Sequence, residues 1–295
     1  MIKPIRDEQI VIGSIALHCV QWGTHGSPVI FLHGLTANAF CFQTFADELA
    51  TEYQVIAYDL RGRGDSAKPA SGYSVPIHAA DLAQFIATQH LQCPVIIGHS
   101  LGALIALYFA AHYPDKLSGL VLIDAGAPLW QNPAEQPAWL TAAITRLGTP
   151  TPSFEDYKAR LQKAPFPGPH WNDAINTYFE HDITHQNDGS VISKAALHAI
   201  LEEGQNFYQA HPDQQWEHVQ VPTLLLRAGQ KLFVENDQLL SEQAAQSIQQ
   251  HIANCRYINY PTLNHYTIIF GIEQGPAQEI RKFLYETTTK IEKTR

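Results

Sequence analysis

The sequence predicts an α/β protein in which helices flank a mostly parallel central sheet and a helical cap is inserted between two strands. Strand-like and helix-like segments alternate through the first third of the 295 residues, which is the pattern of βαβ units. The alternation breaks at Gly126 and resumes at Pro222. A serine bounded by glycines, in Gly98-His99-Ser100-Leu101-Gly102, joins a short apolar run to a long one, as a buried strand joins a buried helix.

Short apolar runs predict the strands, and longer runs with helical periodicity or rich in Ala and Leu predict the helices. The segments 9–13 and 15–21 predict a hairpin that adds antiparallel strands at one edge. The expected parallel strands are 29–32, 54–58, 94–97, 120–123, 222–226 and 256–259. The expected helices are 42–49, 78–90, 101–111 and one that begins near 276.

A shift in composition marks the predicted cap. Residues 127–217 are rich in Pro, Trp, His and Tyr, and prolines interrupt their helical patches. We therefore expect residues 1–126 and 218–295 to form the core and residues 127–217 to form the cap.

Composition and charge restrict the class of protein. A hydrophobic content of 45% with 16% charged residues is typical of a soluble globular protein, and the formal charge of −9 argues against nucleic acid or an anionic membrane as partner. The four cysteines lie far apart without a C-x-x-C pair, which favours reduced thiols in the cytoplasm. We find no apolar stretch of signal-peptide or membrane-spanning length, so we expect a cytoplasmic protein.

Ser100 is the predicted nucleophile. A tight turn between a strand and a helix forces its backbone into a strained conformation and directs its hydroxyl out of the sheet. The glycines on either side let the strand and helix approach without Cβ clashes. The alternative is a glycine-rich packing turn without chemistry.

A serine nucleophile needs a base to take its proton, and His265 is the predicted base. Ligand sites form at the carboxyl ends of parallel strands, and His265 comes just past the last predicted strand. His99 is adjacent to the serine, but we expect its side chain to point away across the turn.

Four sequence features together resemble the α/β-hydrolase superfamily: the Ser100 turn, His33-Gly34 after the first parallel strand, 59–66 after the next, and the late histidine. The resemblance covers about 1–126 and 218–295. It implies that the backbone N–H groups of Leu35 and Leu101 form an oxyanion hole. It also implies that the arginine- and glycine-rich turn within 59–66 is structural and does not bind phosphate.

The resemblance leaves the acid of the triad open. Most of the family carries it after the strand that corresponds to 222–226, where the nearest carboxylates here are Glu235 and Asp237, and Asp237 could instead cap a helix. A minority, including the haloalkane dehalogenases, carries it after the preceding strand, where this chain has Asp124. A carboxylate there is costly to bury without a partner, and His265 is the expected partner, so we favour Asp124.

These residues predict a cofactor-free serine hydrolase of carboxylic esters or lactones, acting through a Ser100 acyl-enzyme. The expected partner is a small molecule with an apolar group, which aromatic residues of the cap would cover during the reaction. The alternative is that these aromatic residues only pack the cap on the sheet. These aromatic residues are Trp130, Trp139, Phe166, Trp171 and Tyr178. The alternatives are a C–C bond hydrolase, an acyltransferase or a perhydrolase on the same triad, and a receptor or signalling module for a small ligand.

Two histidines of the predicted cap have a metal-site spacing. His181 and His185 would share one face of a helix, as in some zinc sites, but no third ligand is obvious nearby. We therefore expect a solvent-facing helix there and no metal.

Overall fold

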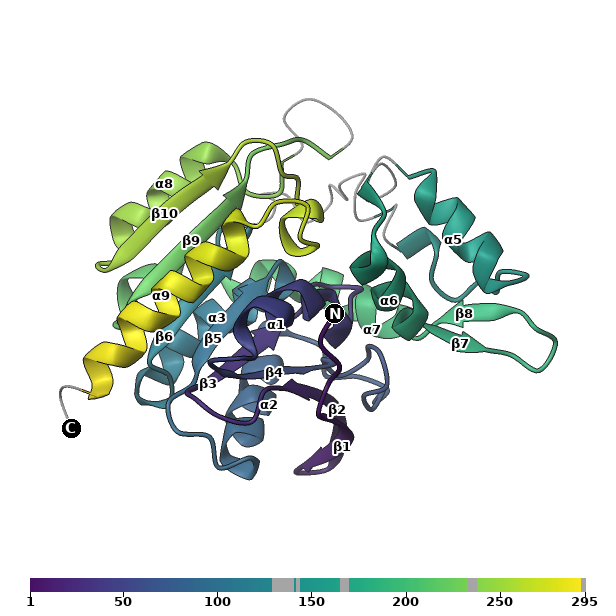
Figure 1. Ribbon diagram of the computed structural model, residues 1–295, viewed down its shortest axis with the longest axis horizontal. Helices are drawn as coiled ribbons and strands as arrows, with labels where there is room; N and C mark the ends of the chain where they lie inside the picture. The colour runs from purple at the N-terminus through teal and green to yellow at the C-terminus, as the bar shows by residue number, and fades with distance from the viewer. Residues whose placement is uncertain (129–140, 142–143, 165–169, 233–237, 293–295) are drawn as a thin grey trace.

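Eight strands form the main sheet in the part of the chain that the structure describes (Figure 1). This computed structural model describes residues 1–128, 141, 144–164, 170–232 and 238–292, with only the backbone of Tyr208 and of 290–292. The strand order is β1-β2-β4-β3-β5-β6-β9-β10. The bounds are β1 (Arg6–Ile12), β2 (Ile15–Trp22), β3 (Pro28–Leu32), β4 (Gln54–Tyr58), β5 (Val95–His99), β6 (Gly119–Ile123), β9 (Thr223–Ala228) and β10 (Cys255–Tyr260).

The pairing of these strands confirms the predicted α/β class. β1 and β2 form an antiparallel hairpin, and β2 also runs antiparallel to β4. Every other pair in the main sheet is parallel. The carboxyl ends of β3, β4, β5, β6, β9 and β10 therefore lie along one edge of the sheet.

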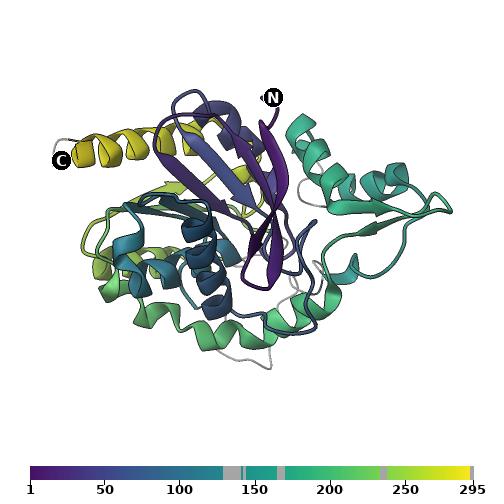
Figure 2. The ribbon, with the colours of Figure 1, turned by 90° about the horizontal axis from the view of Figure 1, so that it is seen from below.

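Helices cover both faces of the sheet (Figures 1 and 2). On one face lie α2 (Val75–Thr88), α3 (Leu101–His112) and α8 (Glu242–His251), and on the other lie α1 (Gln43–Leu49) and α9 (Gly275–Glu292). Successive strand residues join the two cores in turn: Ile96 packs under α3, and Val95 and Ile97 pack on the opposite side. This burial on both faces explains why the central strands are apolar without interruption.

Local sequence features explain where two helical segments begin. The helix predicted at 78–90 begins earlier, at Val75, because extended Ser74 precedes it and Pro76 occupies its first turn. The helix predicted at 42–49 is a 3-10 turn (Ala39–Phe42) followed by α1. The Asn38 side chain caps that turn by accepting a hydrogen bond from the Phe40 N–H.

The residues between β6 and β9, 124–222, contain further elements that we call the β6–β9 segment. They are α5 (Phe154–Gln162), α6 (Asp173–Asp182), β7 (Ile183–His185), β8 (Val191–Ser193) and α7 (Leu197–Asn206). α5, α6, β7 and β8 stand beside the sheet in both views (Figures 1 and 2). The predicted cap lies within this segment, and its boundaries at 127 and 217 stay a prediction.

The expectation of a helix that carries both His181 and His185 is wrong. α6 ends at Asp182, and His185 lies in β7, which pairs antiparallel with β8. The β-branched residues Ile183 and Thr184 favour the strand, and Gly189 closes the hairpin with a φ of +86°. Because α6 ends before His185, the two histidines do not share one helix face. The His181 ring stacks on Phe40, with ring centroids 3.4 Å apart.

All four cysteines are free thiols. Among the helices that the structure describes, none has both the length and the apolar character needed to cross a membrane.

Candidate active site

The serine lies in a strained turn between β5 and α3. Ser100 has a φ of +58° and a ψ of −122°, a region that residues other than glycine rarely adopt. A Cβ on Gly98 would lie 2.1 Å from the Gly102 carbonyl oxygen, and one on Gly102 would lie 1.9 Å from the Leu32 carbonyl oxygen. Only glycine fits at either position, so the strained, glycine-dependent turn that the sequence predicts is confirmed.

Two backbone N–H groups near this turn are available to a ligand. Leu101 is the first residue of α3, so its N–H has no acceptor within the helix. Within the described residues, neither the Leu101 nor the Leu35 N–H donates a hydrogen bond. A Cβ placed on Gly34 would lie 3.6 Å from Ser100 Oγ, so the chain that leads into Leu35 passes close to the serine.

His33 fixes the direction of the Leu35 N–H. The Leu60 N–H donates to His33 Nε2 at 2.9 Å, so His33 Nδ1 carries the proton and donates to the Gly34 carbonyl oxygen at 2.8 Å. The peptide that joins Gly34 to Leu35 is planar, so holding its C=O also orients its N–H. Burial lowers the pKa of His33 to about 4, which keeps the ring neutral in this role.

His265 is hydrogen-bonded to Asp124 across the sheet edge. Nδ1 of His265 lies 2.8 Å from Oδ2 of Asp124, and both side chains are buried. The other carboxylate oxygen, Oδ1, accepts a hydrogen bond from the Ala228 N–H at 2.9 Å. With its Nδ1 proton held by the carboxylate, His265 has a lone pair on Nε2 that can accept a proton.

Burial governs the electrostatics of this pair. It lowers the pKa of His265 to about 3, because the charged imidazolium is poorly solvated there. It also raises the pKa of Asp124, and the Ala228 N–H and the Arg227 guanidinium oppose that shift. The neutral imidazole is the form that a general base needs.

The His265 loop is attached to the serine turn through His99. Nε2 of His99 lies 2.8 Å from the carbonyl oxygen of His265, and the two rings lie 4.5 Å apart between centroids. Ser100 makes no side-chain hydrogen bond within the described part of the chain. Contacts between a nucleophile and its base are often long before a substrate binds, so the Ser100–His265 contact stays a prediction.

Several other candidates lie outside the described residues. They are the alternative acids Glu235 and Asp237 and the aromatic residues Trp130, Trp139 and Phe166. Of the remaining aromatics, Trp171 stacks on Phe179 with centroids 5.6 Å apart, and Tyr178 contacts Phe270. These are packing contacts, and whether either ring also lines a substrate cavity stays a prediction.

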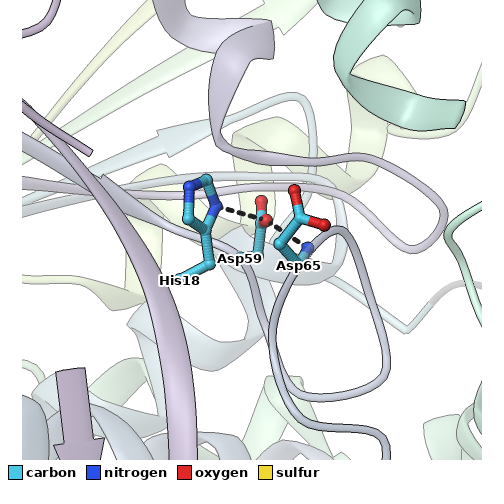
Figure 3. A group of neighbouring side chains, drawn as sticks. All are labelled: His18, Asp59 and Asp65. Atoms are coloured by element: carbon cyan, nitrogen blue, oxygen red, sulfur yellow. Dashed lines mark hydrogen bonds and ion pairs between the residues drawn. The ribbon is translucent and has the colours of Figure 1, made fainter. Parts of the chain in front are cut away.

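A cluster of one histidine and two aspartates, His18, Asp59 and Asp65, lies where β4 ends (Figure 3). Ligand atoms of His18, Asp59 and Asp65 lie within 4.8 Å of one another, close enough for a metal ion. Both ring nitrogens of His18 are already engaged, however, at 2.7 Å from Asp59 and 2.7 Å from Asp7. Burial alone would lower the pKa of His18, but the two carboxylates raise it to about 9. A protonated imidazole has no lone pair for a metal, so this cluster is an ion-pair network.

The structure also shows two residues that the sequence did not single out. Arg63 donates a hydrogen bond to the carbonyl oxygen of Leu35, and Arg146 donates one to the carbonyl oxygen of Thr36. Arg63 lies in the turn that was expected to be structural, and nothing in the local pattern indicates where its guanidinium binds.

Comparison with known proteins supports the family. A family model described as "alpha/beta hydrolase fold" matches residues 27–272. A 2-(acetamidomethylene)succinate hydrolase of Mesorhizobium japonicum is 34% identical over 151 residues, which are 51% of this chain and 52% of that protein. The matched part thus spans about half the length of this curated relative.

Two solved structures show the same fold over nearly the whole chain. The crystal structure of an E-2-(acetamidomethylene)succinate hydrolase has a TM-score of 0.79 and 25% identity, and covers 95% of this chain and 98% of that one. A thermophilic esterase from Thermogutta terrifontis has a TM-score of 0.72 and 21% identity, and covers 96% and 99%. Since the family model spans most of the sequence, this chain belongs to the alpha/beta hydrolase fold family.

Proposed function

We propose that this protein is a serine hydrolase that cleaves carboxylic esters or lactones. The observation that carries the proposal is the 2.8 Å hydrogen bond between His265 and Asp124, at the sheet edge that also presents Ser100. A histidine held by a buried carboxylate beside a strained serine is the arrangement that activates a hydroxyl nucleophile.

The proposed reaction proceeds through an acyl-enzyme. Nε2 of His265 takes the proton from Ser100 Oγ as that oxygen attacks the carbonyl carbon of the substrate. The resulting oxyanion accepts hydrogen bonds from the N–H groups of Leu35 and Leu101. The tetrahedral intermediate then collapses, and the imidazolium of His265 protonates the leaving alkoxide. A water molecule, deprotonated by His265, then attacks the acyl carbon; the bond from that carbon to Ser100 Oγ breaks, His265 returns the proton to Oγ, and the acid leaves.

We further propose that residues 127–217 form a cap over this site and that the substrate is a small molecule with an apolar group. The aromatic residues in this range, including Trp171 and Tyr178, support that choice. A second candidate is hydrolysis of an acetamido group on a dicarboxylate, because the relative named for such a compound matches by sequence and by fold. The attack on an amide carbonyl would use the same residues.

A labelling experiment tests the proposal. A fluorophosphonate should modify the wild-type protein at Ser100, detected by intact mass, and Ser100→Ala should abolish the modification. A panel of p-nitrophenyl esters of graded chain length, N-acyl homoserine lactones and an acetamido-substituted dicarboxylate then separates the two candidates. A protein that neither labels nor cleaves any of these compounds would contradict both. Labelling without repeated turnover would favour the receptor alternative.

A further inference from the structure

Two arginines donate to successive carbonyl groups of one loop; Arg63 is fully buried and Arg146 is partly buried. We call residues 33–38 the oxyanion loop, because it contains Leu35. Nε of Arg63 donates to the Leu35 carbonyl oxygen at 2.9 Å, and Nη2 of Arg146 donates to the Thr36 carbonyl oxygen at 2.8 Å. Hydrogen bonds from a charged donor are shorter and stronger than those between neutral groups.

Each arginine is held by a carboxylate from the β6–β9 segment. Glu203 in α7 accepts from Nη2 of Arg63 at 3.1 Å, and both side chains are fully buried. Asp182 in α6 accepts from Nη1 of Arg146, which also donates to the Tyr157 hydroxyl at 2.8 Å. A guanidinium taken out of water needs a carboxylate partner, so the fully buried Arg63 depends on Glu203 and the partly buried Arg146 is held by Asp182.

The geometry of the loop links these contacts to the Leu35 N–H. His33 fixes the peptide before Leu35 through the Gly34 carbonyl, and Arg63 fixes the peptide after it through the Leu35 carbonyl. With both flanking peptides held, the backbone dihedral angles of Leu35 have little freedom. An N–H group that is held before the reaction stabilises a developing oxyanion without reorganising.

We propose that Arg63 and Arg146 are positioning residues for the oxyanion hole, through which α6 and α7 control the direction of the Leu35 N–H. This inference rests on the proposed function. It makes the activity depend on the placement of the β6–β9 segment, although neither arginine needs to touch the substrate.

The test uses variants of each arginine in the full chain. Arg63→Met and Arg146→Met remove the guanidinium but keep most of the side-chain volume. The control is Lys194→Met, which breaks the 2.6 Å contact of Lys194 with Asp65, another link between the β6–β9 segment and the core. This control contact does not involve the oxyanion loop.

The readout compares a p-nitrophenyl ester with the corresponding thionoester, whose sulfur is a poor hydrogen-bond acceptor. For both Met variants, kcat on the oxygen ester should fall about 10- to 100-fold while KM changes less than about threefold. The thionoester should lose much less, so the ratio of the two rates falls. The control variant should keep both rates and their ratio. If a Met variant does not fold, Glu203→Gln or Asp182→Asn weakens the same contacts without changing volume.

The outcomes separate this inference from the proposed function. Folded variants that keep the wild-type kcat, or that lose both rates by the same factor, would overturn the positioning role alone. A wild-type protein that is not labelled by a fluorophosphonate and has no ester turnover would overturn the proposed function, and the inference with it.

Discussion

Replacing Asp124 with asparagine is the sharpest test of the site, because the change keeps the shape of the side chain. The carboxylate makes two hydrogen bonds, one to Nδ1 of His265 and one to the Ala228 N–H. In Asp124→Asn the amide oxygen can still accept from Ala228, which places the amide NH2 group toward His265. That donor needs a lone pair on Nδ1, so the proton moves to Nε2, and His265 can no longer take a proton from Ser100.

The expected loss is about 10⁴-fold in kcat, as for other triad aspartates. This corresponds to about 5.4 kcal/mol, since each factor of ten is worth about 1.36 kcal/mol. The structure explains why the value is large. The imidazolium that forms as the serine attacks is buried, and in the variant it has no counter-charge.

The assay is steady-state hydrolysis of the best p-nitrophenyl ester, with the thermal unfolding midpoint measured for each variant. Asp237→Asn serves as the matched comparison, because it tests the rival acid with the same chemical change. We expect it to change kcat by less than about threefold, because Asp124 already occupies the position of the acid beside His265. A folded Asp124→Asn protein within tenfold of wild type, or a larger loss in Asp237→Asn, would refute this assignment of the acid.

Three further predictions concern stability and pH. Gly98→Ala should lower the free energy of unfolding, measured by urea denaturation, by about 3 kcal/mol or more, because the added Cβ would clash with the backbone of Gly102. Gly189→Ala, where no atom lies within 4 Å of the added Cβ, should lower it by only about 1 kcal/mol. The acid limb of kcat/KM should have its midpoint below 6.5, since burial lowers the pKa of His265 and the neutral ring is needed; a midpoint above 7 would contradict this. His18→Gln should destabilise the protein by about 3 kcal/mol at pH 6 and by much less at pH 10. The reason is that the carboxylates raise the pKa of His18 from 6.5 to about 9, so its ion pairs stabilise the folded state below pH 6.5 and this stabilisation is lost as pH rises through about 9. An equal effect of the substitution at both pH values would show that the ion pairs are not responsible.

The predictions that held depend on interactions between near neighbours in the chain. The strained serine turn follows from the glycines two residues before and after it, so its conformation is readable from five consecutive residues. The parallel sheet follows from the alternation of apolar runs, because burial on both faces requires it. The one predicted helix that failed, across 181–185, failed because pairing of β7 with β8 outweighed the local spacing of two histidines.

The sequence by itself determined the α/β class, which segments of the chain form the parallel strands, and the serine turn, since each depends on local periodicity and backbone sterics. Only the tertiary structure decided which carboxylate lies beside His265, because Asp124 is 141 residues away and meets it through the order of the strands. The same holds for the arginines on the oxyanion loop, whose hydrogen bonds and carboxylate partners join segments up to 140 residues apart. Such contacts carry no periodic signal, because buried charges are placed by whichever partner the packed chain brings within reach.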